Sequence, residues 1–317
     1  MSSPIADLTY RNYDGPIEPP IYRWWGIAKM MMRLSIKKKG FWVWSSFSAY
    51  FYLILGAIFY FAEALSPTVS AQAGQGVPIP SIFRNIIWKD QFLTAFNTGQ
   101  IFFLIITLLI GAGAIAGDNK ANALLVYLSK PLSKRDYIIG KWFGVFIPLA
   151  IVTAAPMLLF FAYCLLSYRQ YGVVSQDPWL VVKLLLLAPV PAAFHASVIL
   201  GISSLFNQGR LAGAAYAGVY FLTNFLTIAA SAIRLHGPGQ SESPLLTTLY
   251  YCSVDGIQQA MAKIILGTRG STPFGPQNSD MLPDIPSKPL FIGLYFGICA
   301  AFVLLAWRKV RAVEVIG

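Results

Sequence analysis

Ionisable side chains that could carry chemistry are scarce in this sequence. His195 lies inside a long apolar run, and Asp255 lies in a later segment of mixed character. An ionisable residue within a membrane helix is costly and tends to be functional. A single histidine in a helical bundle is more often hydrogen-bonded to a neighbouring helix, and this is the role we expect for His195. The rival interpretation is an intramembrane enzyme that uses His195 or Asp255.

Metal and nucleotide chemistry lack a recognisable motif. The two histidines and three cysteines are scattered, without zinc-site spacing and without a His-Glu-x-x-His helix. The sequence has no Gly-x-Ser-x-Gly elbow. It also has no Gly-x-x-x-x-Gly-Lys-Ser/Thr phosphate loop, because the Gly140–Lys141 pair is followed by Trp142. We expect no metal, no catalytic residue and no cofactor in this chain.

The composition is that of a membrane protein. Of 317 residues, 56% are hydrophobic and only 12% are charged. Apolar runs of about 20 residues match a helix that crosses a hydrocarbon core of roughly 30 Å, and none alternates like a barrel strand. The sequence predicts an all-α membrane protein with six transmembrane helices, over residues 43–62, 92–116, 142–167, 180–206, 211–233 and 290–307.

Basic residues orient these predicted helices. The formal net charge is +11, and most Lys and Arg residues precede the first helix, separate the second from the third, or follow the last. Such loops face the cytoplasm, so both termini are expected there. The basic excess therefore reflects topology, and a nucleic-acid partner is not expected, because no soluble basic patch is evident.

An amphipathic segment precedes the first predicted span. After a polar tail over 1–22, residues 23–40 predict a helix whose apolar and basic side chains fall on opposite sides. We expect this helix to lie flat on the lipid bilayer at the cytoplasmic leaflet. The residues assigned to the interface are Trp24, Trp25, Lys29, Met31 and Arg33. The alternative is a basic stop signal whose Met and Trp side chains pack on protein.

The rest of the sequence predicts one membrane domain over 41–310, followed by a cytoplasmic tail over 311–317. The outer segment over 234–289 is apolar enough for helix in its middle, but Asp255–Gly256 interrupts it. We expect a helix on the outer surface, or one that dips between the spans and returns. Glycine pairs spaced four residues apart predict close helix packing. These pairs are Gly113/Gly117, Gly209/Gly213 and Gly293/Gly297.

A polar island separates the second and third predicted spans. Leu124, Leu125 and Leu128 form a narrow apolar stripe, and Pro131 ends the helix that carries it. Residues 118–131 thus predict a short amphipathic cytoplasmic helix. A helix of about three turns is marginal alone in water, so it needs a packing partner. That partner is either the chain's own bundle or a separate soluble protein.

The island resembles the signature of the ABC-2 family of membrane permeases, the transmembrane subunits of many bacterial ABC transporters. That signature runs from an acid through Gly-Thr-Leu and Leu-Leu-Ser-x-Pro-hydrophobic-Ser-Arg to a Gly-Lys pair. Asp118 stands at the acid, residues 127–133 at the Leu-Leu-Ser-x-Pro box and Gly140–Lys141 at the closing pair. Asn122 and Ala123 replace the Gly-Thr of the family.

The resemblance implies that the island is a coupling helix seated in a groove of a separate ATPase subunit, with the 23–40 helix as an elbow beside it. Two permeases, identical or different, and two ATPase copies would form one exporter in the bacterial cytoplasmic membrane, and the ATPase would bind ATP and Mg²⁺. The residues assigned to this contact are Asp118, Lys120, Asn122, Leu124, Leu125, Leu128, Ser129, Lys130, Pro131 and Arg135.

The expected function is a non-catalytic permease subunit of an ATP-driven exporter. The resemblance implies that spans two and five line the path, and their apolar character favours an amphiphilic or lipid-like substrate. The sparse polar residues assigned to the path are Asn97, Gln100, Thr223, Asn224 and Thr227. The alternative is a membrane anchor or assembly protein whose cytoplasmic helix docks a partner without transport. Co-purification of an ATPase distinguishes the two.

Overall fold

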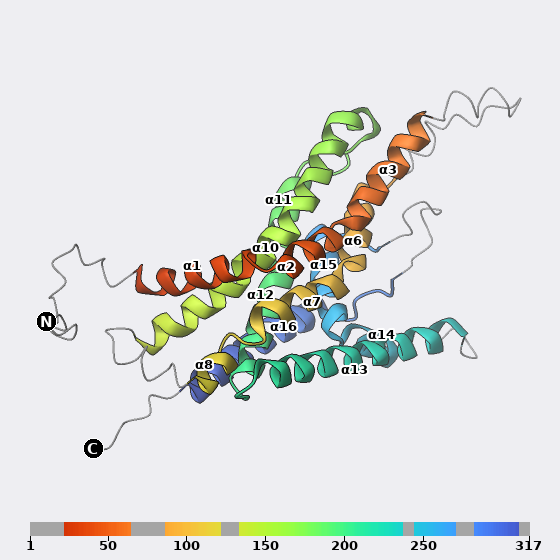
Figure 1. Cartoon of the computed structure of the whole chain (residues 1–317). Helices are drawn as coiled ribbons and strands as arrows, with labels where there is room; N and C mark the ends of the chain where they lie inside the picture. Colours follow the sequence, from red (N-terminus) through yellow and green to blue (C-terminus); the bar gives the residue numbers. More distant parts are fainter. Residues whose placement is uncertain (1–21, 65–85, 122–132, 237–243, 271–281, 311–317) are drawn as a thin grey trace, which may run out of the picture.

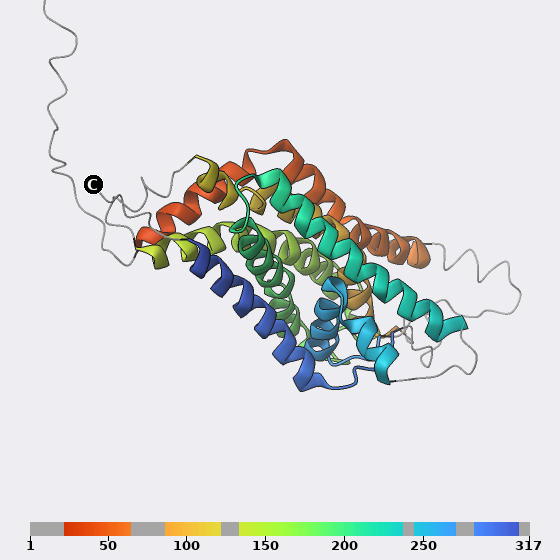
Figure 2. The same cartoon turned by 90° about the horizontal axis from the view of Figure 1, so that it is seen from below.

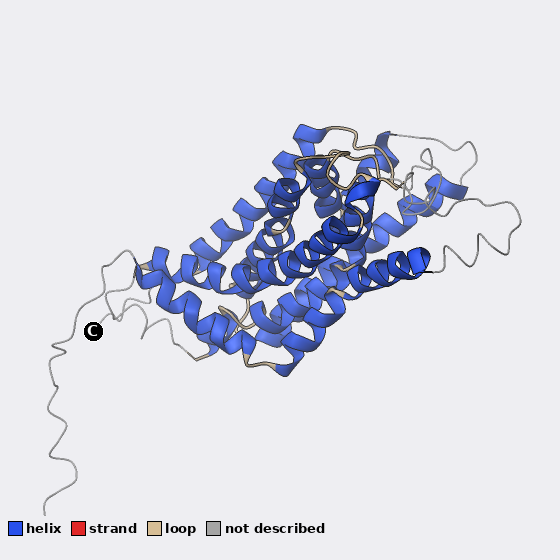
Figure 3. Ribbon diagram, turned by 90° about the horizontal axis from the view of Figure 1, so that it is seen from above, coloured by secondary structure: helices blue, strands red, loops and turns tan. Residues whose placement is uncertain are grey.

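Every regular element in the described part of the chain is a helix. The computed structural model describes residues 22–64, 86–121, 133–236, 244–270 and 282–310 (Figure 3). Five of its helices are long and apolar enough to cross a membrane, and a bent pair supplies a sixth if the pair is one span. The predicted all-α class is confirmed, and each of the six predicted spans corresponds to one helix or to two or three consecutive helices.

Basic residues gather at one end of the bundle. The starts of α10 (Lys134–Ser167) and α13 (Gly209–His236) meet the ends of α8 (Ala116–Lys120) and α16 (Lys288–Lys309) on the left of Figure 1. We call this the basic end. Its basic residues include Lys120, Lys134, Arg135, Lys141, Arg210, Arg308 and Lys309. The last turns of α3 (Tyr50–Ala64) and α13 lie at the far end, on the right of Figures 1 and 2.

The helix before the first span is shorter than predicted. α1 (Arg23–Ile36) ends before residue 40, and α2 (Lys39–Ser48) already belongs to the span. α2 and α3 then meet at a bend of 41°. Three serine hydroxyls before the bend donate to carbonyls within their own helix, a pattern that often bends helices. The first span is therefore a bent pair rather than one straight helix.

The second predicted span, over 92–116, is not continuous. It comprises α6 (Trp88–Thr98), α7 (Gln100–Gly111) and α8. At Gly99 a Cβ atom would lie 3.2 Å from the Ser48 carbonyl oxygen, so α2 approaches the break closely.

The break between α7 and α8 is stabilised by one side chain of α12 (Pro189–Ser203). The backbone N–H groups of Ile115 and Ala116 donate to Ser203 Oγ at 3.1 and 3.0 Å. The same hydroxyl donates to the Ala112 carbonyl at 2.8 Å. Because backbone groups buried in a bundle must be paired, this hydroxyl allows the helix to break there.

The remaining spans lie close to their predicted positions. α10 contains the predicted 142–167 span and extends toward the basic end, where Ser133 Oγ accepts from the Asp136 N–H at 3.1 Å and caps it. A short 3₁₀ helix, Arg169–Tyr171, follows α10. The fourth span consists of α11 (Leu180–Leu187) and α12, and α13 and α16 are the last two.

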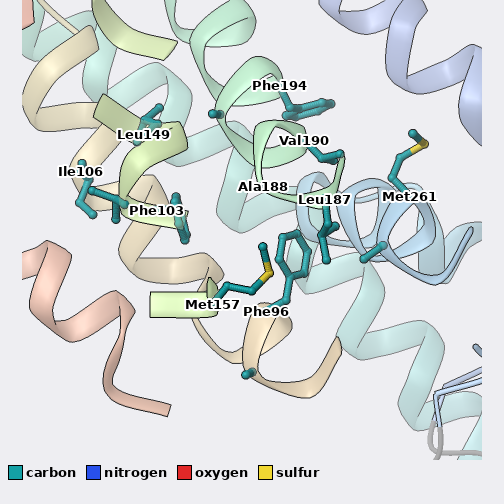
Figure 4. Close-up of a cluster of buried hydrophobic side chains, with 14 of the residues drawn as sticks. Phe96, Phe103, Ile106, Leu149, Met157, Leu187, Ala188, Val190, Phe194 and Met261 are labelled. Atoms are coloured by element: carbon teal, nitrogen blue, oxygen red, sulfur yellow. The ribbon is translucent and has the colours of Figure 1, made fainter. Parts of the chain in front are cut away.

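The segment between α13 and α16 enters the bundle. It forms α14 (Pro244–Tyr251) and α15 (Val254–Leu266). The chain breaks before Ser253 and not at Asp255–Gly256 as predicted, because Ser253 Oγ accepts from the Gly256 N–H at 2.9 Å and caps α15. Figure 4 shows Met261 of α15 in the same apolar cluster as Met157 of α10.

The turn between α14 and α15 reaches the middle of α13. Thr227 Oγ1 donates to the Tyr250 carbonyl at 3.0 Å, and Thr223 Oγ1 accepts from the Val254 N–H at 3.4 Å. The far end of α15 lies near α11, where Lys183 Nζ donates to the Leu266 carbonyl at 3.4 Å. Of the two arrangements expected for this segment, the structure has the helix that dips between the spans and returns.

Candidate functional site

The start of the predicted coupling segment is held by a polar cluster that we call the Asp118 clamp: Asp118, Tyr137 and Lys141. Lys141 Nζ lies 2.7 Å from Asp118 Oδ2, and Tyr137 Oη donates to the same oxygen at 2.7 Å. Lys141 is 6% exposed and Tyr137 is fully buried. Residues 137 and 141 are one helical turn apart, so α10 presents both groups to one carboxylate. Charge-assisted hydrogen bonds of this kind are stronger than hydrogen bonds between neutral groups.

Two further contacts fix the region around α8. Asn119 Nδ2 donates to the Phe206 carbonyl at 3.3 Å. A Cβ atom on Gly209 would lie 2.9 Å from the Gly113 Cα atom, so the start of α13 packs directly on the α7–α8 turn. α8 and the turn before it are therefore joined to α10, to α12 and the turn after it, and to α13.

Three of the ten residues assigned to the ATPase contact belong to the described part of the chain. Asp118 is half-buried in the clamp, Lys120 is exposed at the end of α8, and Arg135 is exposed in the first turn of α10. The others lie outside the described residues: Asn122, Leu124, Leu125, Leu128, Ser129, Lys130 and Pro131.

α1 packs along the first turns of α10. A Cβ atom on Gly140 would lie 2.6 Å from the Trp24 carbonyl oxygen, and one on Gly144 would lie 2.7 Å from Met31 Cβ. The Trp24 ring also packs on Phe143, with the ring centroids 4.9 Å apart. The two glycines make the groove that lets the helix backbones approach closely.

The sides of α1 have different surroundings. Trp24 and Met31 face α10, which is the protein packing named as the alternative for them. Lys29 and Arg33 are exposed, and Trp25 is 40% exposed. Contact of this exposed side with lipid remains a prediction.

Four of the five polar residues assigned to a path line one pocket of about 370 Å³. It lies between α6, α7, α13 and the start of α15. The four are Asn97, Gln100, Asn224 and Thr227. Thr223, the fifth, lies beside it and accepts from the Val254 N–H. The structure therefore brings the assigned residues together, although they come from distant parts of the sequence.

Asp255 is the one charged side chain among the described residues that line this pocket. Its Oδ2 atom accepts from Tyr220 Oη at 2.6 Å and from Asn224 Nδ2 at 3.0 Å. From the sequence, Asp255 was a catalytic candidate and part of a predicted helix interruption, and no local pattern linked it to α13. The one signal available was its ionisable side chain within an apolar segment.

His195 joins three helices. It is fully buried, its Nδ1 atom lies 2.6 Å from Tyr216 Oη, and Gln258 Nε2 donates to its Nε2 atom at 3.3 Å. These bonds connect α12 to α13 and α15, as expected for a structural histidine. Within the described ranges, no group of three or more His, Cys, Asp or Glu side chains could hold a metal ion.

Asp177, between α10 and α11, forms a second ionic cluster away from the basic end. Its Oδ2 atom lies 3.1 Å from Lys89 Nζ and 2.6 Å from Lys183 Nζ, and its Oδ1 atom accepts from the Trp179 N–H. Burial acts to raise the pKa of this carboxyl, but the bonds from Lys183 and Lys89 outweigh it and the pKa is lowered. The cluster ties α6 to α11 and was not anticipated from the sequence.

Together these features define a multi-pass helical membrane protein with a charged joint at one end and a polar pocket between its helices. The chain belongs to the ABC-2 family: the family model described as "ABC-2 family transporter protein" matches residues 25–278. No curated protein matches the chain. The predicted family is thus confirmed. The chain is a transport permease, of a family that normally works with an ABC ATPase.

Proposed function

We propose that the chain is the permease subunit of an ATP-driven exporter in the bacterial cytoplasmic membrane, with the basic end in the cytoplasm. It carries no catalytic activity of its own. Two permease copies and two copies of a separate ATPase form the exporter, and ATP and Mg²⁺ bind the ATPase. The family match and the Asp118 clamp support this proposal.

The Asp118 clamp is the observation on which the coupling proposal rests. Closure of a soluble ATPase must be transmitted as movement of membrane helices, and a segment joined rigidly to two spans can transmit it. The clamp joins α8, at the end of the second span, to α10, which is the third. A displacement of the 118–131 segment would therefore move both spans together.

α1 belongs to the same mechanical unit. It rests on Gly140 and Gly144 of α10, beside Lys141 of the clamp. We infer that α1 is the elbow helix, and that it moves with α10 when the ATPase closes. Its exposed basic side, with Lys29 and Arg33, would face anionic headgroups or the ATPase surface.

An exposed apolar face of α13 supports a second permease copy. Its residues are 52–66% exposed and carry no polar group. They are Phe221, Leu222, Phe225, Leu226 and Ile228. Phe221 and Ile228 also line the polar pocket, so a copy packed here would enclose a path beside it. An apolar path with one polar pocket suits an amphiphilic or lipid-like substrate.

Purification of the tagged chain from its native membranes in mild detergent tests this function. We expect an ATPase with a phosphate-binding loop to co-purify in equimolar amount. We also expect ATP to drive transport of the substrate across the membrane of vesicles that contain the complex. A chain that purifies without any ATPase, under conditions that keep the bundle folded, would favour the non-transporting anchor instead.

A further inference from the structure

The polar pocket presents hydrogen-bond acceptors that lack donors. Within the described part of the chain, Asn97 Oδ1, Gln100 Oε1 and Asp255 Oδ1 are buried and have no hydrogen-bond partner. All three residues line the pocket, and they come from α6, α7 and α15. Gln100 is only 3% exposed. A buried acceptor without a donor destabilises the site, so a ligand that supplies donors is favoured there.

The bonds that Asp255 already makes explain its position but leave half of its carboxylate unused. Oδ2 accepts from Tyr220 and Asn224 and ties α15 to α13. A purely structural contact between α15 and α13 would need only these two hydrogen bonds. Oδ1 is buried and has no hydrogen-bond partner among the described residues, so a donor brought to it by a ligand would satisfy it.

The charge of the pocket lining favours a ligand with a positive charge. Its described lining contains one carboxylate and neither Lys, Arg nor His. The α14–α15 turn also places Asp255 beside Tyr220 and Asn224 of α13, near the middle of that helix. A carboxylate at such depth in a membrane protein is expensive unless a positive group pairs with it.

The walls add a second preference for a cation. Three aromatic residues, Tyr220, Phe221 and Tyr250, line the same pocket. Aromatic faces attract ammonium groups, and the attraction increases where water is excluded. Phe221 and Ile228 continue the lining onto the exposed apolar face of α13, where an apolar tail could lie.

We propose that this pocket binds a primary ammonium group of the transported amphiphile, with Asp255 Oδ1 as its counter-ion and Gln100 Oε1 and Asn97 Oδ1 as further acceptors. The N–H donors of the ammonium match the unpartnered acceptors in number and sign. This inference rests on the proposed transport function and names the class of its substrate: a lipid-like molecule with a free amine.

Binding of benzylammonium to the full chain in lipid nanodiscs tests the inference, with empty nanodiscs as the blank. The aromatic ring lets ligand-observed NMR follow binding at pH 7.5, and the molecule fits a pocket of about 370 Å³. We expect saturable binding in the millimolar range, because the ligand has few atoms. Benzoate and benzyl alcohol should not bind, and benzyltrimethylammonium, which has no N–H donor, should bind at least fivefold more weakly.

Variants then assign the binding to the pocket. Asp255→Asn should weaken benzylammonium binding at least tenfold, whereas Asp284→Asn, which changes an exposed acid outside the pocket lining, should leave it unchanged. Gln100→Met keeps every bond of Asp255 and should weaken binding about threefold, which provides a test if Asp255→Asn fails to fold. Absent saturable binding, or equal binding by the wild type and a folded pocket variant, would overturn the inference.

The outcome is separable from that of the transport proposal. Binding is measured without an ATPase, so a chain that binds the amine in an Asp255-dependent way but co-purifies with no ATPase contradicts transport alone. A chain that co-purifies with its ATPase and does not bind benzylammonium contradicts only the assigned substrate class.

Discussion

Lys141 Nζ lies 2.7 Å from Asp118 Oδ2, and this ion pair connects the last helix turn described before residue 122 to the first turns of α10. The pair joins the second span to the third at the base of the predicted coupling helix. The Gly140–Lys141 pair therefore has two separate roles. Gly140 lets the α1 backbone approach α10 closely, and Lys141 forms the ion pair with Asp118 of α8.

Removing the cation of the Asp118 clamp should destabilise the bundle. Lys141→Met leaves the carboxylate of Asp118 partly buried with only Tyr137 as its described partner, and we expect a loss of about 2 kcal/mol, because breaking one side of such a pair costs more than replacing both. The thermal unfolding midpoint in detergent measures it. The double change Asp118→Asn with Lys141→Met should recover part of the loss; equal midpoints for the single and double variants would argue against the clamp.

Side chains added to the α10 groove should separate α1 from α10. Gly140→Ala places a Cβ atom against the Trp24 carbonyl, and Gly144→Ala places one against Met31, so each should cost about 1–3 kcal/mol. Gly297→Ala in α16 is the matched control, because nothing lies within 4 Å of its added Cβ atom. If all three variants unfold at the same temperature, the close packing of α1 is wrong.

The Asp177 cluster should make stability depend on acid pH. Its folded pKa is depressed below the unfolded value of 3.8, so the contribution is fully present above pH 3.8 and is lost as the pH falls through the folded pKa. The wild type should therefore unfold at a higher temperature than Asp177→Asn at pH 5–7, and the difference should shrink below pH 4. A difference that grows as the pH falls would contradict the assigned ion pairs.

His195 should matter for folding and not for chemistry. His195→Ala leaves a cavity and removes the bonds to Tyr216 and Gln258, at a cost of about 3 kcal/mol, whereas Tyr216→Phe should cost about 1 kcal/mol. His195→Gln, which can keep one of these bonds, should retain ATP-driven transport by the reconstituted complex. Loss of transport in a folded His195→Gln variant would instead indicate a functional histidine.

Hydropathy and charge predicted the helices of this protein better than their breaks. Apolar length alone indicates a span. The α7–α8 break instead depends on Ser203, which is far away in sequence and whose hydroxyl accepts from two backbone N–H groups and donates to one carbonyl. Glycine spacing was likewise only partly informative. Gly209 does approach Gly113, but the Gly293/Gly297 pair meets nothing within 4 Å in the described structure.

The candidate site shows the same limit. The acid and the Gly-Lys pair of the island were recognisable as a family pattern, yet the Asp118–Lys141 bond needs the fold to bring them together. The polar residues of spans two and five could be chosen as path residues because polar groups are rare there. That they meet Asp255 depends on the α14–α15 turn reaching the middle of α13, which local sequence does not encode.

We propose that residues 118–131 couple this permease to a separate ATPase. Changing Leu124 and Leu128 together to Asp should remove the ATPase from the purified complex while leaving the elution volume and unfolding midpoint of the permease unchanged, because charges at the apolar anchors of an interface abolish it. The same two positions changed to Met should retain the ATPase. Undiminished ATPase binding by the folded Asp variant would contradict the coupling role of residues 118–131.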